Sequence, residues 1–149
     1  MRRVRAAWIM LALLGVASIV ARAFSEARNG AVSCGKTGEV YIDGVRSDAD
    51  CTDTYVSVFG IWPLVQLGLL LVAPAIVAAC VLRAWVSVAA TATYGALTVI
   101  GVVNWADWWG QLIGPCLIAS VPALIITLLH LHVQSSSYRR RAGHHRLAR

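Results

Sequence analysis

The sequence predicts an all-α membrane protein, a bundle of four transmembrane helices with a small disulfide-closed loop on the extracytoplasmic side. Composition is one reason, because 58% of the 149 residues are hydrophobic and only 13% are charged, against about 25% in a soluble domain. Charge distribution is the other. Six of the seven acidic residues lie within residues 24–55, whereas most arginines lie in segments without any acid. Since basic segments stay on the cytoplasmic side of a membrane, this separation predicts the side of each segment.

The first apolar segment, residues 6–23, follows a basic start with three arginines, and we expect it to be a spanning helix. The same segment is also typical of a secretory signal, because Ala-Arg-Ala at 21–23 matches the small-residue pattern of a cleavage site. Cleavage would leave three spanning helices without changing the side of any later segment. The retained helix is favoured, since the apolar run reaches the upper end of the usual signal core length.

The second and third spans share one apolar stretch, residues 61–103, in which Arg83 is the single charge. One helix of that length would be about 65 Å long, roughly twice the hydrocarbon thickness of a bilayer. The chain must therefore turn back, and Arg83 is the residue that most strongly prefers water. The sequence predicts spans at 61–82 and 84–103, joined by a tight cytoplasmic turn.

The fourth span is expected at residues 112–131, followed by a basic cytoplasmic tail at 134–149. Arg139, Arg140 and Arg141 in this tail are predicted to contact anionic lipids. Both termini are thus expected in the cytoplasm and the chain in the cell (plasma) membrane. The strong preference for arginine over lysine, with the high alanine and valine content, suggests a bacterial protein.

Tryptophan and proline agree with these boundaries. All six tryptophans fall at predicted membrane interfaces, where an amphipathic indole is most stable. Pro74 and Pro122 lie inside the second and fourth spans. Each removes one backbone donor, so we expect both helices to kink.

Residues 24–55 form the predicted extracytoplasmic loop. Cys34 and Cys51 lie in it, on the oxidising side of the membrane, and are expected to form a disulfide. Closing a loop of this size removes roughly 3 kcal/mol of unfolded-chain entropy. Between them, alternating residues around Asp43-Gly44 predict a short β-hairpin.

This loop has two interpretations. It is either a stapled segment that only protects itself or a recognition surface for an extracytoplasmic partner. Three of its aspartates follow a D-x-D-x-x-D spacing, but the glycine and distal glutamate of a calcium loop are missing. We therefore predict no metal site. The predicted partner-facing residues are Glu39, Tyr41, Asp43, Asp48, Asp50 and Asp53.

Small residues occur at the spacing that lets membrane helices approach closely. Ala92 and Ala96 lie on one face of the third span, and Gly110 and Gly114 form a GxxxG at the start of the fourth. These four are the predicted helix-packing residues. The sequence leaves open whether they pack within the bundle or onto a partner.

The predicted spans contain no deeply placed Asp, Glu, Lys or Arg. Ion-coupled transporters need such residues, and the small four-helix drug exporters need an embedded carboxylate. The four-helix disulfide-forming quinone reductases need a Cys-x-x-Cys pair, which the sequence also lacks. Cys116 and Ser120 are the only candidate nucleophiles, and we expect them at the opposite depth from the histidines. The chain is therefore not expected to be an enzyme or to bind a cofactor.

The net charge of +6 reflects arginine on the retained side of a membrane protein, so no nucleic-acid partner is expected. The function predicted from the sequence is an accessory, scaffold or assembly subunit of a membrane complex. Its expected partners are the lipid bilayer and other membrane subunits or further copies of itself. The alternative is a small lipid or apolar-solute transport component, suggested by the expected kinks and by Gln66 and Tyr94 within the spans.

Overall fold

Four long apolar helices form the structure, a computed structural model that describes residues 2–27, 34, 38–42, 45–104 and 108–147. The side chains of Ile42, Trp108 and residues 136–147 are outside the description. Within the described residues, these four helices are long and apolar enough to cross a membrane, as predicted. Their bounds are α1 (Arg2–Ala23), α4 (Trp62–Val81), α5 (Ala84–Val103) and α6 (Ile113–Leu147).

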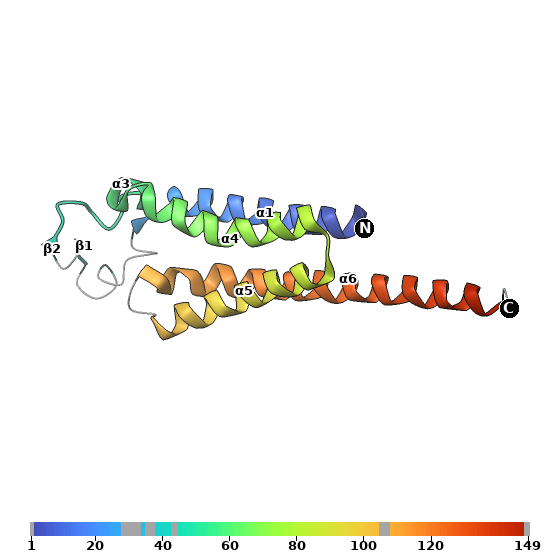
Figure 1. Ribbon diagram of the computed structural model, residues 1–149. Helices are drawn as coiled ribbons and strands as arrows, with labels where there is room; N and C mark the ends of the chain where they lie inside the picture. Colours follow the sequence, from blue (N-terminus) through green and yellow to red (C-terminus); the bar gives the residue numbers. More distant parts are fainter. Residues whose placement is uncertain (1, 28–33, 35–37, 43–44, 105–107, 148–149) are drawn as a thin grey trace.

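The helices lie side by side with alternating direction, so both chain ends and the α4–α5 turn lie at one end of the bundle (Figure 1). The loop with its short elements lies at the other end. Helix α6 is longer than the predicted span, since it continues through the basic tail and projects beyond the other helices. The shorter elements are β1 (Tyr41–Ile42), β2 (Val45–Arg46), α3 (Tyr55–Phe59) and the 3-10 helix η2 (Trp108–Leu112).

Two closely packed helix pairs, α1 with α4 and α5 with α6, make up the bundle. The pairs meet where α1 touches α6 and α4 touches α5, whereas α4 and α6 barely meet across the centre. Trp8, Leu67, Tyr94 and Leu112 are buried and fill the interior. Helices α1, α4 and α5 each contribute one of these large side chains to the core, and η2 contributes the fourth.

Glycine and alanine bring α1 and α4 together. An added Cβ at Gly15 would lie 3.3 Å from Cγ2 of Val72, so the two backbones approach closely there. Ala75, Ala78 and Ala79 on α4 are buried in the same core cluster as Trp8. Small side chains on α4 thus leave room for the large indole on α1.

The predicted turn at Arg83 is confirmed, since α4 ends at Val81 and α5 begins at Ala84. Leu82 adopts the left-handed conformation, with φ 49° and ψ 31°, and its N–H donates to the carbonyl of Ala78. A left-handed residue is a common way to end a helix, although glycine usually fills that position. The next carbonyl, that of Ala79, accepts a hydrogen bond from Nε of Arg5 on α1 at 3.3 Å.

Helix α4 continues through Pro74 and α6 through Pro122. Proline lacks an N–H, so Pro74 deprives the carbonyl of Leu70 of its helical donor and loosens the turn that precedes it. The neighbouring carbonyl of Leu71 accepts a hydrogen bond from the hydroxyl of Tyr94 at 2.6 Å. A side chain of α5 therefore ties the proline-containing turn of α4 to the second helix pair.

Replacing Gly101 with alanine should destabilise the protein by about 1–3 kcal/mol. An added Cβ there would lie 3.0 Å from the backbone oxygen of Trp109 and 3.2 Å from the backbone nitrogen of Ile113. Gly95→Ala is the matched control in the same helix, since its added Cβ meets nothing within 4 Å. Alanine there should be neutral or stabilise the helix by up to about 1 kcal/mol. Thermal unfolding in detergent measures both, and equal Tm values would contradict the close approach at Gly101.

Candidate functional site

The loop carries the predicted disulfide and the predicted hairpin. Cys34 and Cys51 are joined, with their Cα atoms 5.8 Å apart. Strands β1 and β2 pair antiparallel with Tyr41 opposite Arg46. Asp43, which was assigned to the turn and to the partner-facing set, lies outside the described residues. The disulfide and the two strands together give the loop a defined shape at the end of the bundle.

Backbone hydrogen bonds attach the loop to the helix ends. Glu26 and Thr54 form an isolated antiparallel bridge. Next to it, the N–H of Ala27 donates to the carbonyl of Asp53 at 2.7 Å, and the N–H of Tyr55 donates to the carbonyl of Ser25 at 2.8 Å. The segment after α1 and the segment before α3 are thus held side by side, which supports the disulfide-closed part between them.

Arg22 connects three elements beneath the loop. Its Nη2 donates to Oε1 of Gln111 in η2. Its guanidinium carbon lies 5.6 Å from the ring centre of Tyr55 in α3, a distance at which a cation is attracted to the aromatic face. Burial raises the pKa of the Tyr55 phenol, and the positive charge of Arg22 opposes part of that rise. The last turn of α1 is therefore anchored to η2 and α3.

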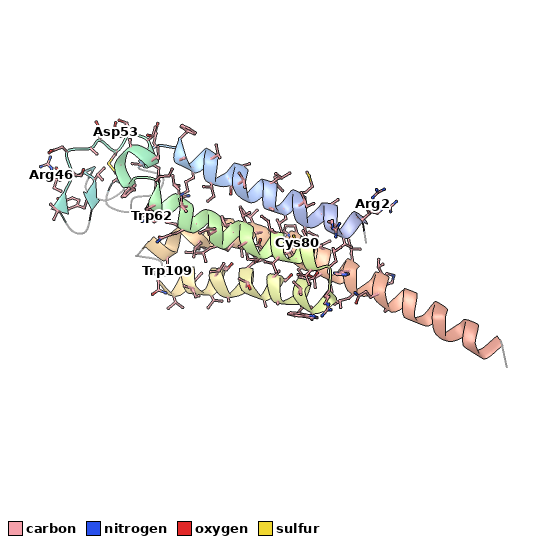
Figure 2. All side chains as sticks on the ribbon, turned by 45° about the horizontal axis from the view of Figure 1, so that its top comes forward. Arg2, Arg46, Asp53, Trp62, Cys80 and Trp109 are labelled. Carbon is pink, nitrogen blue, oxygen red and sulfur yellow. A yellow bond between two sulfur atoms is a disulfide. The ribbon has the colours of Figure 1, made fainter. Side chains whose placement is uncertain are left out.

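The predicted partner-facing residues differ in how exposed their side chains are and in whether they bond within the loop. Glu39 is half-buried and engaged, since its carboxylate lies 2.9 Å from Nη2 of Arg46 and accepts from the Tyr41 hydroxyl at 3.1 Å. Asp50 and Asp53 are exposed, but an oxygen of Asp53 accepts from the N–H of Asp50 at 2.8 Å. Tyr41 and Asp48 are exposed as well (Figure 2 labels Asp53 and Arg46 at this end).

A local hydrogen bond links two aspartates of this segment. An oxygen of Asp53 accepts from the N–H of Asp50 and closes a turn. Among the described residues, no group of three His, Cys, Asp or Glu side chains comes close enough to hold an ion. The described part of the loop presents exposed acidic residues and the exposed Tyr41.

A buried polar cluster joins α5 to α6 near the opposite end of the bundle. Oγ of Ser87 lies 2.8 Å from Nδ1 of His130, and both side chains are completely buried. The hydroxyl oxygens of Thr91 and Thr127 lie 2.9 Å apart, and both lie within hydrogen-bond distance of the Ser87 carbonyl, at 3.0 Å and 3.1 Å. Each hydroxyl carries one proton and donates to one of these acceptors at a time. The amide nitrogen of Gln134 lies 3.4 Å from Nε2 of His130.

The Ser87–His130 pair has the spacing of a nucleophile and its general base. The grooves described between the helices are lined by neither residue. Of the two nucleophiles named from the sequence, Cys116 is completely buried. Ser120 is half-buried, and its hydroxyl donates to the Cys116 carbonyl at 2.7 Å. The cluster is a hydrogen-bonded lock between two helices.

Sequence reasoning missed the pair, although a signal was present. Ser87 and Thr91 are four residues apart, and Thr127, His130 and Gln134 recur at intervals of three and four. Two polar stripes at helical spacing on consecutive antiparallel spans point toward each other more often than toward lipid. Comparing the polar stripes of two consecutive spans with each other would have predicted this α5–α6 cluster.

Three of the four predicted helix-packing residues are exposed, and Gly110 is half-buried. Ala92 and Ala96 are exposed on the outer face of α5. Gly110 lies in η2 and Gly114 is exposed, and an added Cβ at Gly114 meets nothing within 4 Å. Ala92, Ala96 and Gly114 thus leave small-residue surface uncovered in the single chain, and their role in helix packing stays a prediction.

An open groove of about 490 Å³ lies between α4 and α5, beside the exposed alanines. Gln66 is exposed one turn into α4. The described residues form no hydrogen bond with its amide, so Gln66 does not join Tyr94 in an interior polar site. Residues lining this groove include Leu70, Ala73, Pro74, Trp85, Ala89 and Thr93.

The predicted lipid-contact residues lie in α6. Arg139, Arg140 and Arg141 fall in the part of α6 that projects beyond the bundle, on the side of the N-terminus. Their side chains are outside the description. The helical backbone places the three consecutive arginines around its circumference, and the interaction with anionic lipid remains a prediction.

Replacing Thr91 with valine should cost roughly 0.6–1.7 kcal/mol of stability, because the two cross-helix contacts of its hydroxyl are lost at constant shape. Those contacts go to the Ala123 carbonyl at 3.2 Å and to Thr127. Thr93→Val is the matched control, since that hydroxyl bonds only within its own helix, to the Ala89 carbonyl. Detergent unfolding curves compare the two, and an equally large loss in the control would contradict the lock.

In the folded, unreduced protein, a maleimide reagent should label Cys80 alone. Cys34 and Cys51 are joined, Cys116 is completely buried, and Cys80 is exposed. Denaturation without reduction should add one label and reduction two more, which intact mass resolves. Cys80→Ser is the control that removes the first label. More than two labels on unreduced, denatured protein would show that the disulfide is absent.

Comparison with models of known protein families, with characterised proteins and with solved structures finds no match. A function must therefore be argued from this chain's own surfaces. The described residues offer three features: the acidic disulfide-closed loop, the buried α5–α6 lock, and the outer face of α4 and α5 with its groove and exposed small residues.

Proposed function

We propose that the protein is an integral membrane protein that serves as an accessory, scaffold or assembly subunit of a membrane complex and has no catalytic activity of its own. We place it in a bacterial plasma membrane with both termini in the cytoplasm. The charge distribution supports this orientation, because Arg2, Arg3 and Arg5 lie at the end opposite the acidic loop (Figure 2 labels Arg2).

Retention of α1 as a fourth span is part of this proposal. Trp8 of α1 is completely buried, and Gly15 approaches Val72 of α4. Removal of α1 would expose the alanine-rich face of α4 that it covers. The anchoring of Arg22 to Gln111 supports retention at the other end of the helix.

The observation that carries the proposal is the outer face of α4 and α5. Exposed Ala92 and Ala96 allow another backbone to approach closely, and the groove beside them offers a concave surface. An exposed amide such as Gln66 is poorly placed in hydrocarbon and gains a hydrogen bond from a partner helix. A face that combines small residues, a groove and an amide is suited to a transmembrane partner.

The loop offers a second contact on the extracytoplasmic side. Its exposed residues, including Tyr41 and Asp48, lie on a framework fixed by the disulfide and by the hydrogen bonds to α3. A rigid surface loses less conformational entropy on binding than a flexible one. A partner that contacts both the helix face and the loop would be held in one orientation.

A specific groove favours the alternative, a small lipid or apolar-solute transport component. It lies between α1 and α6, has a volume of about 260 Å³ and reaches Tyr94 past Gly114 and Pro122. Against this alternative, the Tyr94 hydroxyl is already bonded to Leu71, and Gln66 faces outward. Transfer of a fluorescent lipid across proteoliposomes that contain the purified protein would favour the alternative, and no transfer above empty liposomes would exclude it.

Photo-cross-linking from position 92 tests the subunit proposal. A photoreactive residue in place of Ala92 should give a discrete adduct in native membranes, whereas one in place of Ile118, exposed on α6, should not. Ala92→Trp should dissociate the complex while Ile118→Trp leaves it intact, because both positions are exposed and neither change disturbs the core. Equal adducts from both positions, or none from either, would contradict the proposal. An adduct of twice the chain mass would identify the partner as a second copy.

A further inference from the structure

A second groove, between α1 and α4, combines an apolar wall with one cation. Its volume is about 600 Å³, within the usual range for small-molecule sites. Arg5 is the charged residue in its lining, and Cys80 lies at the same end. The rest of the wall is apolar and includes Ile9, Leu13, Val16, Val72 and Ile76.

The position of Arg5 is fixed. Its Nε donates to the Ala79 carbonyl at 3.3 Å, across the α1–α4 interface. Carbonyls in the last turn of a helix lack backbone donors and carry partial negative charge, so this bond suits a cation. No described residue bonds the terminal nitrogens of the guanidinium, which offer further donors for a phosphate group at the mouth of the groove.

Among the described residues, the positive charge at this end faces no acidic side chain. Arg2 and Arg3 are exposed on the same helix end, and Arg83 is exposed in the α4–α5 turn. The sequence contains no Asp or Glu in residues 1–25 or 54–106. An anion that neutralises Arg5 must therefore come from outside the protein.

The length of the groove identifies the kind of anion. From Arg5 to Val16 the helix rises about 17 Å, close to half of the roughly 30 Å hydrocarbon core of a bilayer. One lipid chain of one leaflet has that reach. The same helix pair carries a second groove of about 510 Å³ farther along, which shares Val16 and Val72 but has no charged residue in its lining.

We propose that the groove between α1 and α4 binds one anionic phospholipid, with its phosphate at Arg5 and an acyl chain along the wall toward Val16. The inference rests on the proposed membrane insertion with the basic end in the cytoplasmic leaflet. The uncharged outer groove accepts lipid chains without selecting a headgroup. The inner groove is therefore a headgroup-selective site, distinct from the arginine-rich tail of α6.

Native mass spectrometry of the purified full chain tests this site, with phosphatidylglycerol and phosphatidylcholine of identical acyl chains as probes. Phosphatidylglycerol should bind more tightly, and Arg5→Gln should weaken its binding about fivefold through the loss of one cation–headgroup attraction. Arg3→Gln removes the same charge from the same helix turn outside the groove lining and should change binding less than twofold. Equal binding of the two lipids, or equal effects of the two variants, would overturn the proposal.

Two further measurements keep the test decisive. Leu13→Trp fills the groove while Arg5 stays in place, so it should weaken phosphatidylglycerol binding even if Arg5→Gln destabilises the fold. Unchanged binding in this variant would overturn the proposal. Inorganic phosphate at millimolar concentration should not displace the lipid, and displacement would show an anion site without a lipid site.

Failure of the lipid-site proposal is distinguishable from failure of the proposed subunit function. Lipid binding is measured on the purified chain, whereas the cross-link at position 92 depends on a partner at a different helix pair. A chain that alkaline carbonate releases from membranes would overturn both proposals. A chain that stays in the membrane and cross-links from Ala92, yet binds both lipids equally, would overturn the lipid site alone.

Discussion

The hydrogen bond from Tyr94 to the carbonyl of Leu71 joins the two halves of the bundle. Helices α4 and α5 are consecutive in the chain but pack less closely than the pairs α1–α4 and α5–α6. Tyr94 is completely buried and reaches across at the turn that Pro74 loosens. Tyr94 therefore links α4 and α5 at this turn, and the groove of the proposed partner-binding face lies between the same two helices.

The two helix pairs are held together by different means. In α1–α4, Gly15 and the buried alanines of α4 let the backbones approach, so dispersion contacts dominate. In α5–α6, hydroxyls and an imidazole form the Ser87–His130 lock, and Gly101 allows close contact at the far end. Two helices can slide slightly along an apolar interface, whereas directional hydrogen bonds fix their relative depth and rotation. The α5–α6 pair therefore sets the register of the bundle.

Features that depend on length and local residue type were predictable from the sequence. The four helices, the turn at Arg83, the Cys34–Cys51 disulfide and the two strands all agree with expectation. The rotation of each helix about its axis was not predictable. Lipid and protein interior are both apolar, so hydrophobicity does not separate the buried Ala90 from the exposed Ala92. The same ambiguity concealed the Ser87–His130 pair, which becomes visible only when two helices are considered together.

The position of Arg22 has a consequence for how the chain matures. Its Ala-Arg-Ala context would suit a signal peptidase only while the end of α1 is extended, yet in the folded protein these residues form the last helical turn. The contacts of Arg22 with Gln111 and Tyr55 involve segments synthesised later. A signal peptidase would therefore have to act before Arg22 gains these contacts, because the folded helix end does not present an extended segment.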